Sequence, residues 1–512
     1  MEPLPVTEGV LFTDLYQLTM AQLYFREGIH ERKAQFDYSF RSYPDYGTHQ
    51  AGYCVFAGLG PLLEWMEAAR FGDRELALLA GQLGVKGDPL FGDDFLDWLR
   101  ANGHFGQIEV SAVAEGRVVH PLVPVAVITG PLAMAQILET SFLNHCNYAT
   151  LIASKASRLA DVAHGRPIIE FGMRRGPAEG VNTGGRAALI GGADYTSNVG
   201  ISYALGFDPK GTHAHSMVQA FMAIGGGEIE AFRAYAREYP DDCLLLVDTI
   251  DTLRSGVPHA IEVFRELREA GHEPVGIRLD SGDLAYLAIQ SAAQLDAAGF
   301  SDVSIVLSSN LDELAIWQIL SQIHDEAARY GVDAGKLASR LVYGVGTRLL
   351  TSHGDPALDG VYKLVAIEGE DDWVPAIKVS DTPQKVPAPG QKRLWRVTDD
   401  RGFATADVVS CPDEDLREMD SIVLRHPHRE GVSRALHASQ IASVEELLTP
   451  VFRGAATSAP TIDEMRARRR ADVALLDPGV RRLVNPHVYH VSLTEKMKDL
   501  QLRLIREARL GA

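Results

Sequence analysis

The chain contains little cysteine. Its 512 residues include only four cysteines, and no two of them form a CxxC pair; they are Cys54, Cys146, Cys243 and Cys411. This wide spacing argues against zinc ribbons and redox dithiols, because both need closely paired thiols. Scattered cysteines in a chain of this length are typical of a reducing compartment, so we expect a cytoplasmic protein.

Positive charge is also scarce. Lysine and arginine together number 49 against 68 aspartates and glutamates, which gives a formal net charge of −19. Because nucleic acids bind to a basic face, this charge balance argues against a nucleic-acid partner. It still allows local basic pockets that hold small anions.

Long apolar segments are missing as well. The first residues, MEPLPVTEGVLF, have neither the basic region nor the apolar core of a signal peptide. The longest uncharged run, residues 118–138, contains Pro121, Pro124 and Pro131, which suit strands and turns better than a membrane-spanning helix. We therefore expect no signal peptide and no membrane partner.

Alternating strand and helix patterns fill much of the chain. The segment QFDYSFR, residues 35–41, alternates as a half-buried strand does. From about residue 155, apolar strands alternate with helical patterns; the strands are predicted at residues 166–172, 210–212, 243–248, 274–283, 303–309 and 340–346. This alternation predicts a parallel sheet covered by helices, which fits either a barrel or an open doubly wound sheet.

Polar side chains follow six of these predicted strands. They include Arg174 and Arg175, His213 and His215, Asp248 and Thr249, Arg278 with residues 280–283, residues 308–310, and residues 344–347. Parallel α/β folds bind their ligands at the carboxyl ends of the strands. We therefore expect these side chains to gather on one face of the sheet.

Two of these loops have more than one interpretation. The segment Gly344-x-Gly346-Thr347 could bring backbone N–H groups and a hydroxyl close to an anion, or it could be a simple tight turn. Asp280 and Asp283 flank a glycine turn that could hold Mg²⁺ or ribose hydroxyls. Alternatively, Asp283 or the serine before it caps the helix that follows.

The arginines and histidines also leave alternatives open. Strand alternation places Arg278 and Asp280 on one side, so Arg278 pairs either with Asp280 or with a ligand carboxylate. Arg174 is either one of a pair of surface arginines or a phosphate clamp. If the backbone is extended, His213 and His215 point to the same side. Zinc is disfavoured because no third ligand is near, whereas an imidazole beside an acid can serve as base or nucleophile.

Several longer motifs occur in one order along the chain. They are FTDLYQLTM, EFGMRR, GTHAHS, IRLDSGDL, SSNLDE, YGVGT and VYKLV. Together they resemble those of the nicotinate phosphoribosyltransferase family. The resemblance extends from about residue 11 to the C-terminal helices.

The resemblance implies an activity and a fold. Members of the family condense nicotinate with phosphoribosyl pyrophosphate in NAD salvage, coupled to ATP hydrolysis, and they require Mg²⁺; the enzyme is classed as a ligase. The expected fold is α/β, an irregular (β/α) barrel of the type II phosphoribosyltransferase kind with a second, discontinuous α/β domain. We expect residues 141–358 to form the barrel and residues 1–140 the N-terminal domain, completed by part of residues 360–450. Residues 359–512 contain the β-rich segment and the C-terminal helices, and a homodimer is expected.

The resemblance also implies roles for single residues. His215 corresponds to the histidine that ATP phosphorylates, and Asp280 is expected to act in catalysis or to hold Mg²⁺. Tyr16 and Thr212 correspond to nicotinate-site residues, and Arg278 to the partner of the nicotinate carboxylate. Thr347 is expected to bind the sugar phosphate. Further expected substrate-binding residues are Arg174, Asn198, Ser281, Gly282, Asn310, Gly344 and Gly346.

Two alternative functions are compatible with the sequence. The chain could be a phosphoribosyltransferase for another pyridine, either nicotinamide or quinolinate. It could also be a non-catalytic relative that binds nucleotides. The mark of such a relative would be the loss of His215 or Asp280, and both residues are present.

Overall fold

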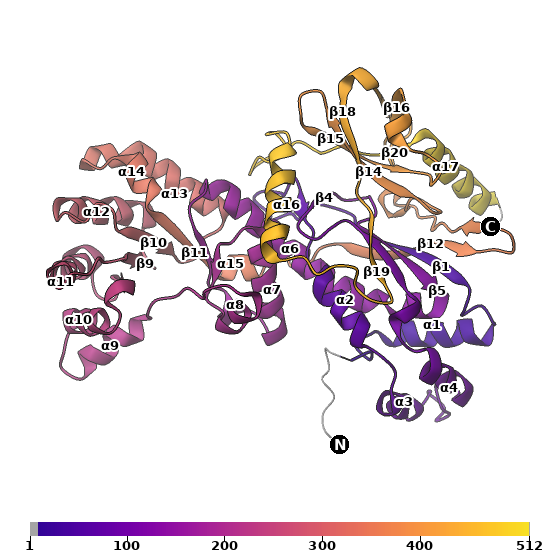
Figure 1. The fold of residues 1–512 in the computed structure, drawn as a ribbon, viewed down its shortest axis with the longest axis horizontal. Helices are drawn as coiled ribbons and strands as arrows, with labels where there is room; N and C mark the ends of the chain where they lie inside the picture. Colours follow the sequence, from indigo (N-terminus) through magenta and orange to yellow (C-terminus); the bar gives the residue numbers. More distant parts are fainter. Residues whose placement is uncertain (1–8, 511–512) are drawn as a thin grey trace. The chain divides into compact units, whose positions relative to one another are not determined.

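The computed structural model describes residues 9–510, apart from the side chain of Gln384. The chain divides into two compact units (Figure 1). Unit 1 contains the described residues up to Ser154 and those from Ala357 onward, and unit 2 contains Lys155–Pro356. Unit 1 is therefore built from two separate stretches of the chain. Among residues 9–510, no helix combines the length and the apolar character needed to cross a membrane.

Unit 2 is built around a parallel sheet. Its six strands are β6 (Ile168–Glu170), β7 (Tyr195–Thr196), β8 (Leu244–Leu246), β9 (Gly276–Leu279), β10 (Ser304–Ser308) and β11 (Leu341–Val345). They lie in the order β7-β6-β11-β10-β9-β8. Helices follow these strands, and the strands are almost wholly apolar because parallel sheets are covered on both faces. The predicted parallel sheet is thus confirmed.

Helices connect the strands of unit 2. They are α7 (Ala178–Gly191), α8 (Val199–Leu205), α9 (His215–Ala223), α10 (Glu228–Glu238), α11 (Val257–Glu269), α12 (Leu284–Ala297), α13 (Glu313–Glu326), α14 (Ala334–Ser339) and α15 (Thr347–Leu350). Asp283 caps α12, because its Oδ1 accepts a hydrogen bond from the Tyr286 N–H at 3.1 Å. The capping interpretation of the acidic turn is therefore confirmed for Asp283.

The sheet of unit 2 is open between β7 and β8, and a closed barrel is not seen. The strand predicted at residues 210–212 is wrong, because this segment is an irregular loop. Pro209 lacks an N–H and Gly211 has no side chain, so neither residue favours strand pairing. This loop makes one backbone hydrogen bond to the sheet, in which the Lys210 N–H donates to the carbonyl of Thr196 on β7 at 3.0 Å.

Unit 1 contains a sheet of six strands that come from both stretches of the chain. Three come from the N-terminal stretch, β1 (Lys33–Phe40), β3 (Glu109–Ala112) and β5 (Ala126–Pro131), and three from the C-terminal stretch, β12 (Gly360–Glu368), β13 (Trp373–Pro375) and β19 (Thr449–Arg453). Their order is β13-β12-β1-β5-β3-β19. The strand predicted at residues 35–41 is confirmed as β1, but it is buried on both faces because it lies in the middle of the sheet.

Unit 1 also contains a second six-stranded sheet, a two-stranded sheet of β2 (Cys54–Val55) and β4 (Val118–Val119), and several helices. The second six-stranded sheet contains β14 (Arg393–Asp399), β15 (Ala404–Ser410), β16 (Ser421–Arg425), β17 (Ser433–His437), β18 (Ile441–Glu446) and β20 (Val491–Thr494). The longer helices are α1 (Leu15–Arg26), α2 (Leu59–Ala68), α4 (Asp93–Asn102), α16 (Ile462–Leu475) and α17 (Glu495–Leu510), and α6 (Glu139–Ala163) runs from unit 1 into unit 2.

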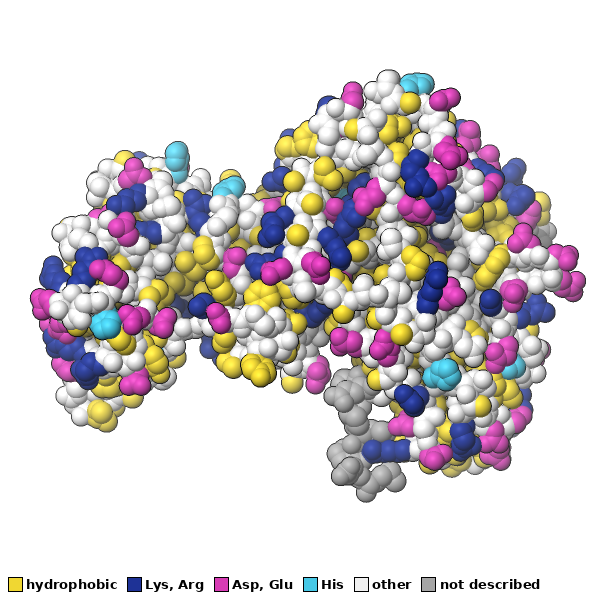
Figure 2. Space-filling model, in the orientation of Figure 1, with side chains coloured by type: hydrophobic (Ala, Val, Ile, Leu, Met, Phe, Trp, Pro, Cys, Tyr) yellow, Lys and Arg dark blue, Asp and Glu magenta, His cyan; other side chains and the backbone are white. Residues whose placement is uncertain are grey.

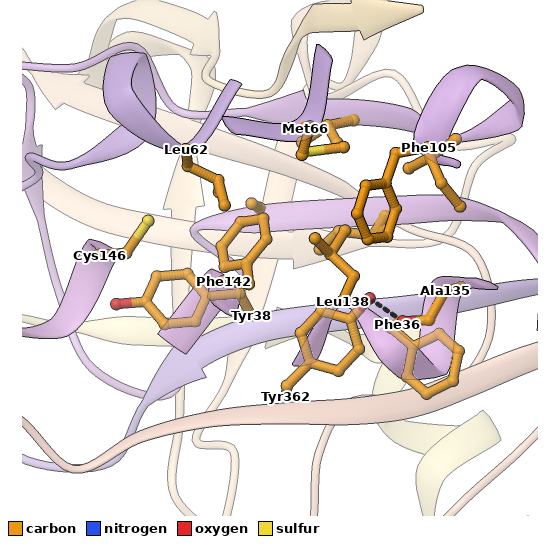
Figure 3. Close-up of a cluster of buried hydrophobic side chains, with 14 of the residues drawn as sticks. Phe36, Tyr38, Leu62, Met66, Phe105, Ala135, Leu138, Phe142, Cys146 and Tyr362 are labelled. Carbon is orange, nitrogen blue, oxygen red and sulfur yellow. Dashed lines mark hydrogen bonds between the residues drawn. The ribbon is translucent and has the colours of Figure 1, made fainter. Parts of the chain in front are cut away.

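Aromatic side chains fill the core of unit 1 (Figure 3). Phe36 of β1 stacks on Tyr362 of β12 with ring centroids 4.9 Å apart, and Phe142 of α6 packs against both Tyr38 and Tyr362. The Tyr362 hydroxyl donates a hydrogen bond to the Ala135 carbonyl at 2.8 Å, so this buried polar group is satisfied. Each buried aromatic side chain contributes about 1.5–3 kcal/mol, and these contacts join the two stretches of unit 1.

Charges of both signs are interspersed on the surface that Figure 2 shows. Arg233 of α10 also contacts three acidic side chains, Glu230, Glu262 and Glu266, at 2.9, 2.6 and 2.7 Å. Solvent screens such exposed pairs, so they contribute little to stability. Acidic side chains on this face thus have basic neighbours, and the face carries no continuous stripe of one charge.

Candidate active site

Asp248 joins two polar loops at the carboxyl end of β8. Its side chain is only 1% exposed, and its Oδ1 accepts a hydrogen bond from His215 Nε2 at 3.1 Å. Its Oδ2 accepts from the Ser281 hydroxyl at 2.5 Å and from the Asp280 N–H at 3.1 Å. The buried carboxylate therefore holds the histidine loop against the acidic turn after β9.

The two histidines of the GTHAHS motif have different environments. Ala214 between them is extended, and both rings reach β8 or its end, so the prediction that they point to the same side is confirmed. His213 Nε2 accepts a hydrogen bond from the Leu246 N–H at 3.1 Å, and burial lowers the pKa of His213 to about 4. His213 is therefore neutral, whereas His215 is partly exposed and donates to a carboxylate.

Arg278 lies at the end of β9 between protein partners and an aromatic ring. Its Nε donates to the Ser308 hydroxyl at 2.9 Å, and its Nη2 lies 3.3 Å from Asp280 Oδ1. Ser308 in turn donates to Asp280 Oδ1 at 2.5 Å. The guanidinium sits 5.1 Å from the centroid of the Phe171 ring. Of the two partners that the sequence allows, Asp280 and a ligand carboxylate, Asp280 is in contact with Arg278, whose side chain is 14% exposed and so largely removed from water.

A second buried carboxylate organises the ends of β6 and β7. Glu170 accepts hydrogen bonds from the Gly172 N–H and from the Thr196 hydroxyl, and burial raises the pKa of the Glu170 carboxyl. Thr196 Oγ1 also accepts from the Asn198 N–H at 3.0 Å. Glu170 thereby fixes Asn198, which caps α8, and the turn that leads to the exposed side chain of Arg174.

Gly344 in β11 and Gly346 just after it are required by packing. A Cβ on Gly344 would lie 2.5 Å from two ring carbons of Phe171, so only glycine leaves room for this ring. A Cβ on Gly346 would lie 3.1 Å from the Phe171 carbonyl oxygen, which is also a close contact. Gly346 directly precedes Thr347, the first residue of α15. Gly344 thus forms the wall behind Phe171 rather than a turn.

The loop after β10 is strained. Ser309 and Asn310 adopt positive φ angles of 95° and 48°, each of which costs a residue other than glycine about 1–3 kcal/mol. Asp312 restrains this loop, because its Oδ1 caps α13 at 2.8 Å from the Ala315 N–H and its Oδ2 pairs with Arg348 of α15. Both Ser309 and Asn310 are exposed.

The structure brings four of the predicted site residues of unit 2 together, namely His215, Arg278, Asp280 and Ser281. An unbroken series of contacts runs from His215 through Asp248, Ser281 and Asp280 to Ser308 and Arg278. Two hydroxyls nearby in the sequence, Thr212 Oγ1 and Thr249 Oγ1, are buried without a hydrogen-bond partner in the described chain. Tyr16 lies in unit 1, on α1, with half of its surface exposed.

Sequence reasoning identified Asp248 only as a polar residue at a strand end and gave it no role, and it missed Glu170 and Phe171. Phe171 and Glu170 lie within the EFGMRR motif, but an apolar ring and a buried acid give no separate signal in a sequence.

The comparisons with known proteins agree on one family. Residues 11–147 match the N-terminal domain of nicotinate phosphoribosyltransferase, and residues 391–501 match the C-terminal domain of nicotinate phosphoribosyltransferase. The nicotinate phosphoribosyltransferase of Bacillus subtilis (strain 168) is 37% identical over 502 residues, which cover 98% of this chain and 96% of the relative. The chain belongs to the nicotinate phosphoribosyltransferase family. The resemblance inferred from the motifs is thus confirmed.

Further members and neighbours extend this assignment. The nicotinate phosphoribosyltransferase of Caenorhabditis elegans is 32% identical over 550 residues, covering 95% of this chain and 92% of the relative. A crystal structure of human nicotinic acid phosphoribosyltransferase superposes with a TM-score of 0.78 at 30% identity, covering 96% of this chain and 99% of the other. Nicotinate-nucleotide pyrophosphorylase from Pyrococcus furiosus, at 21% identity, has a TM-score of 0.63 over 93% of this chain and 97% of its own, and shows a shared fold.

Proposed function

We propose that this chain transfers the phosphoribosyl group of phosphoribosyl pyrophosphate to nicotinate, a step in NAD salvage. The pyridine nitrogen of nicotinate forms a bond to the anomeric carbon of the sugar while the carbon–oxygen bond to pyrophosphate breaks. The products are nicotinate mononucleotide and pyrophosphate. Membership of the nicotinate phosphoribosyltransferase family supports the reaction, and the surroundings of Arg278 support the choice of pyridine.

The observation that carries the choice of substrate is the position of Arg278 beside Phe171. A planar aromatic acid can lie against the ring and pair its carboxylate with the guanidinium. Nicotinamide is neutral, so it would leave this largely buried guanidinium with a weaker partner, at a cost of about 1–3 kcal/mol. That cost corresponds to a preference for nicotinate of roughly 5–150-fold.

ATP coupling is assigned to His215. Its Nε2 donates to Asp248, so Nδ1 carries the lone pair that attacks the γ-phosphorus of ATP. The nitrogen–phosphorus bond forms, the phosphorus–oxygen bond to ADP breaks, and water later hydrolyses the phosphohistidine. His215 is the first residue of α9, where the helix dipole favours negative charge, and Asp248 stabilises the positive charge on the ring. An enzyme with this coupling is a ligase.

Asp280 fits a single-carboxylate site for Mg²⁺. Its Oδ1 contacts Ser308 and Arg278, whereas its Oδ2 has no hydrogen-bond partner in the described chain. Magnesium sites commonly use one or two carboxylates together with substrate phosphates. When bound, Mg²⁺ would neutralise charge on the departing pyrophosphate.

The remaining assignments complete the proposal. Thr347 is assigned to the sugar phosphate, and Thr212 and Tyr16 to nicotinate. Further substrate contacts are assigned to Arg174, Asn198, Ser281, Gly282, Asn310, Gly344 and Gly346. The buried hydroxyl of Thr212, which lacks a protein partner among residues 9–510, supports its role as a donor to a ligand. We also propose a cytoplasmic homodimer.

The decisive experiment measures pyrophosphate release from phosphoribosyl pyrophosphate and nicotinate, with and without ATP. The wild-type protein should release pyrophosphate, and ATP should raise the rate. His215→Ala should lose this ATP stimulation and the nicotinate-dependent ATP hydrolysis, whereas the control His272→Ala, in an exposed histidine paired with Asp241, should keep both.

Three results would contradict parts of the proposal. Unchanged ATP stimulation in His215→Ala removes the role of His215. Comparable turnover of nicotinamide removes the argument from Arg278, and turnover of quinolinate in place of nicotinate assigns a different pyridine acid as the substrate. Tight binding of substrates in calorimetry without pyrophosphate release supports a non-catalytic relative instead.

A further inference from the structure

Within residues 9–510, strand β8 is an edge strand, and no other strand pairs with its outer side. It pairs with β9 on one side, where the Val247 N–H donates to the Arg278 carbonyl at 3.1 Å. Successive N–H groups of a strand point to opposite sides, so the Leu246 N–H points away from β9. A buried N–H of this kind needs an acceptor from elsewhere in the fold.

The imidazole of His213 supplies this acceptor. Its Nε2 accepts from the Leu246 N–H at 3.1 Å, while the ring packs on Tyr235 and Phe232 of α10 with centroids 4.9 and 6.3 Å away. Only the neutral ring with its proton on Nδ1 can accept at Nε2. Its low pKa, a consequence of burial, agrees with this form at neutral pH.

The contacts of His213 and His215 have the same spacing. His213 meets Leu246, and two residues later His215 meets Asp248, two residues further along the chain. The histidine loop thus lies beside β8 and runs parallel to it, where a further strand of the sheet would lie. Its contacts to β8 and to Asp248 are made by imidazole nitrogens, whereas a strand would make them with backbone N–H and carbonyl groups.

Within the described chain, the other hydrogen bonds of residues 211–214 are local: His213 Nδ1 lies 3.5 Å from the Ala214 carbonyl, which also accepts from the Met217 N–H at 3.1 Å. No backbone N–H of residues 211–214 is hydrogen-bonded within residues 9–510, and nothing lies within 4 Å of a Cβ built on Gly211. The ring of His213 is therefore the anchor that sets the register of the loop against β8.

We infer that His213 is a positioning residue that holds His215 Nε2 on Asp248, so that Nδ1 of His215 faces the phosphoryl donor. This inference rests on the proposed phosphorylation of His215. The loss of the anchor should let the loop slide along β8 and should separate His215 from Asp248. It should not disturb Arg278 or the acidic turn, which have their own hydrogen bonds.

The test compares His213→Gln with His213→Leu. Glutamine can place its side-chain oxygen near the position of Nε2 and accept from Leu246, whereas leucine fills a similar volume without an acceptor. Acid-labile phosphate on His215 is measured from ATP with time. The leucine variant should form phosphohistidine about 10–100-fold more slowly, which is the size of effect seen when hydrogen-bond partners that orient metal-binding histidines are removed. The glutamine variant should be within about threefold of wild type, and ATP-independent pyrophosphate release should be unchanged in both.

A long-range proton–nitrogen spectrum of the imidazoles tests the geometry without turnover. His215 should be in the Nε2–H form in the wild type and in His213→Gln, and in a mixture of tautomers in His213→Leu. Equal behaviour of the glutamine and leucine variants overturns the inference, as does a loss of ATP-independent turnover along with phosphorylation. A wild-type protein that forms no phosphohistidine rejects the proposed function, while the spectrum still decides the role of His213.

Discussion

The substitution Asp248→Asn probes the centre of the site with a small change in shape. The carboxylate accepts three hydrogen bonds, and an amide cannot accept on both sides. If its oxygen faces His215, its NH₂ group opposes the Asp280 N–H and the Ser281 hydroxyl. If the amide is flipped, the NH₂ group opposes His215 Nε2 and favours the other tautomer of the ring.

The size of the effect follows from which donors are left unsatisfied. Ser281 is exposed, so its hydroxyl can turn to water, and the cost falls mainly on the Asp280 N–H and on the lost charge. Losing a hydrogen bond to a charged acceptor costs about 1.5–3 kcal/mol. For a unit of this size, that corresponds to a fall of about 3–12 °C in the unfolding midpoint. Phosphorylation of His215 should slow by on the order of 10²–10⁴-fold, because the orienting carboxylate is lost.

Calorimetric melting and the rate of phosphohistidine formation measure these two effects. Asp251→Asn is a matched control in the same loop, because Asp251 caps the next turn through bonds to the Leu253 and Arg254 N–H groups. Asparagine caps as well as aspartate does, so this variant should behave as wild type. If Asp248→Asn melts and phosphorylates like the control, the assignment of Asp248 as the link between the two loops is wrong.

Three further predictions concern other parts of the molecule. Arg278→Met should lower kcat/KM for nicotinate roughly 5–150-fold and change that for nicotinamide much less, which a substrate panel measures; equal losses would contradict the carboxylate role. Gly344→Ala should displace Phe171, destabilise the protein by about 1–3 kcal/mol in urea unfolding and raise KM for nicotinate, and an unchanged KM would separate Phe171 from the pyridine. Burial lowers the pKa of His120 to about 3, so the imidazole binds a proton more strongly in the unfolded chain than in the folded protein. The contribution of neutral His120 to the free energy of unfolding is complete above about pH 6.5 and declines as the pH falls toward 3. Urea unfolding should therefore show a loss of about 2 kcal/mol from His120 between pH 6.5 and 5 that is absent in His120→Phe, and a parallel decline in both proteins would refute this origin.

The parallel sheet of unit 2 could be predicted from the sequence because its apolar strands and capped helices are local signals. Asp283 illustrates this, since a cap depends on residues three positions apart. The prediction of a strand at residues 210–212 was wrong because the structure of this segment depends on contacts with residues that are distant in the sequence. Its neighbours in space are Thr196 and Leu246, and the loop reaches one through its backbone and the other through an imidazole, which no strand pattern describes.

The site itself was only partly predictable. Strand ends and motifs pointed to His215, Arg278 and Asp280, but the spacing of the two histidines could not tell which one accepts from a backbone and which one meets a carboxylate. The sequence predicts an anion-binding loop or a tight turn at Gly344, but Gly344 lies in β11 and packs against the ring of Phe171, which follows β6 and is far away in the sequence. A requirement for glycine that comes from packing against a distant residue produces no local pattern in the sequence.

The interleaved path of unit 1 has a consequence for its synthesis on the ribosome. Asp37 on the central strand β1 is buried beside Lys392, a partner 355 residues later in the chain. At a synthesis rate of 5–20 residues per second, Lys392 is made roughly 20–70 s after Asp37. Strand β12, which pairs with β1, is also made only late in this interval. During this interval, the nascent chain exposes an apolar strand with open hydrogen-bonding groups, which is the kind of surface that chaperones cover.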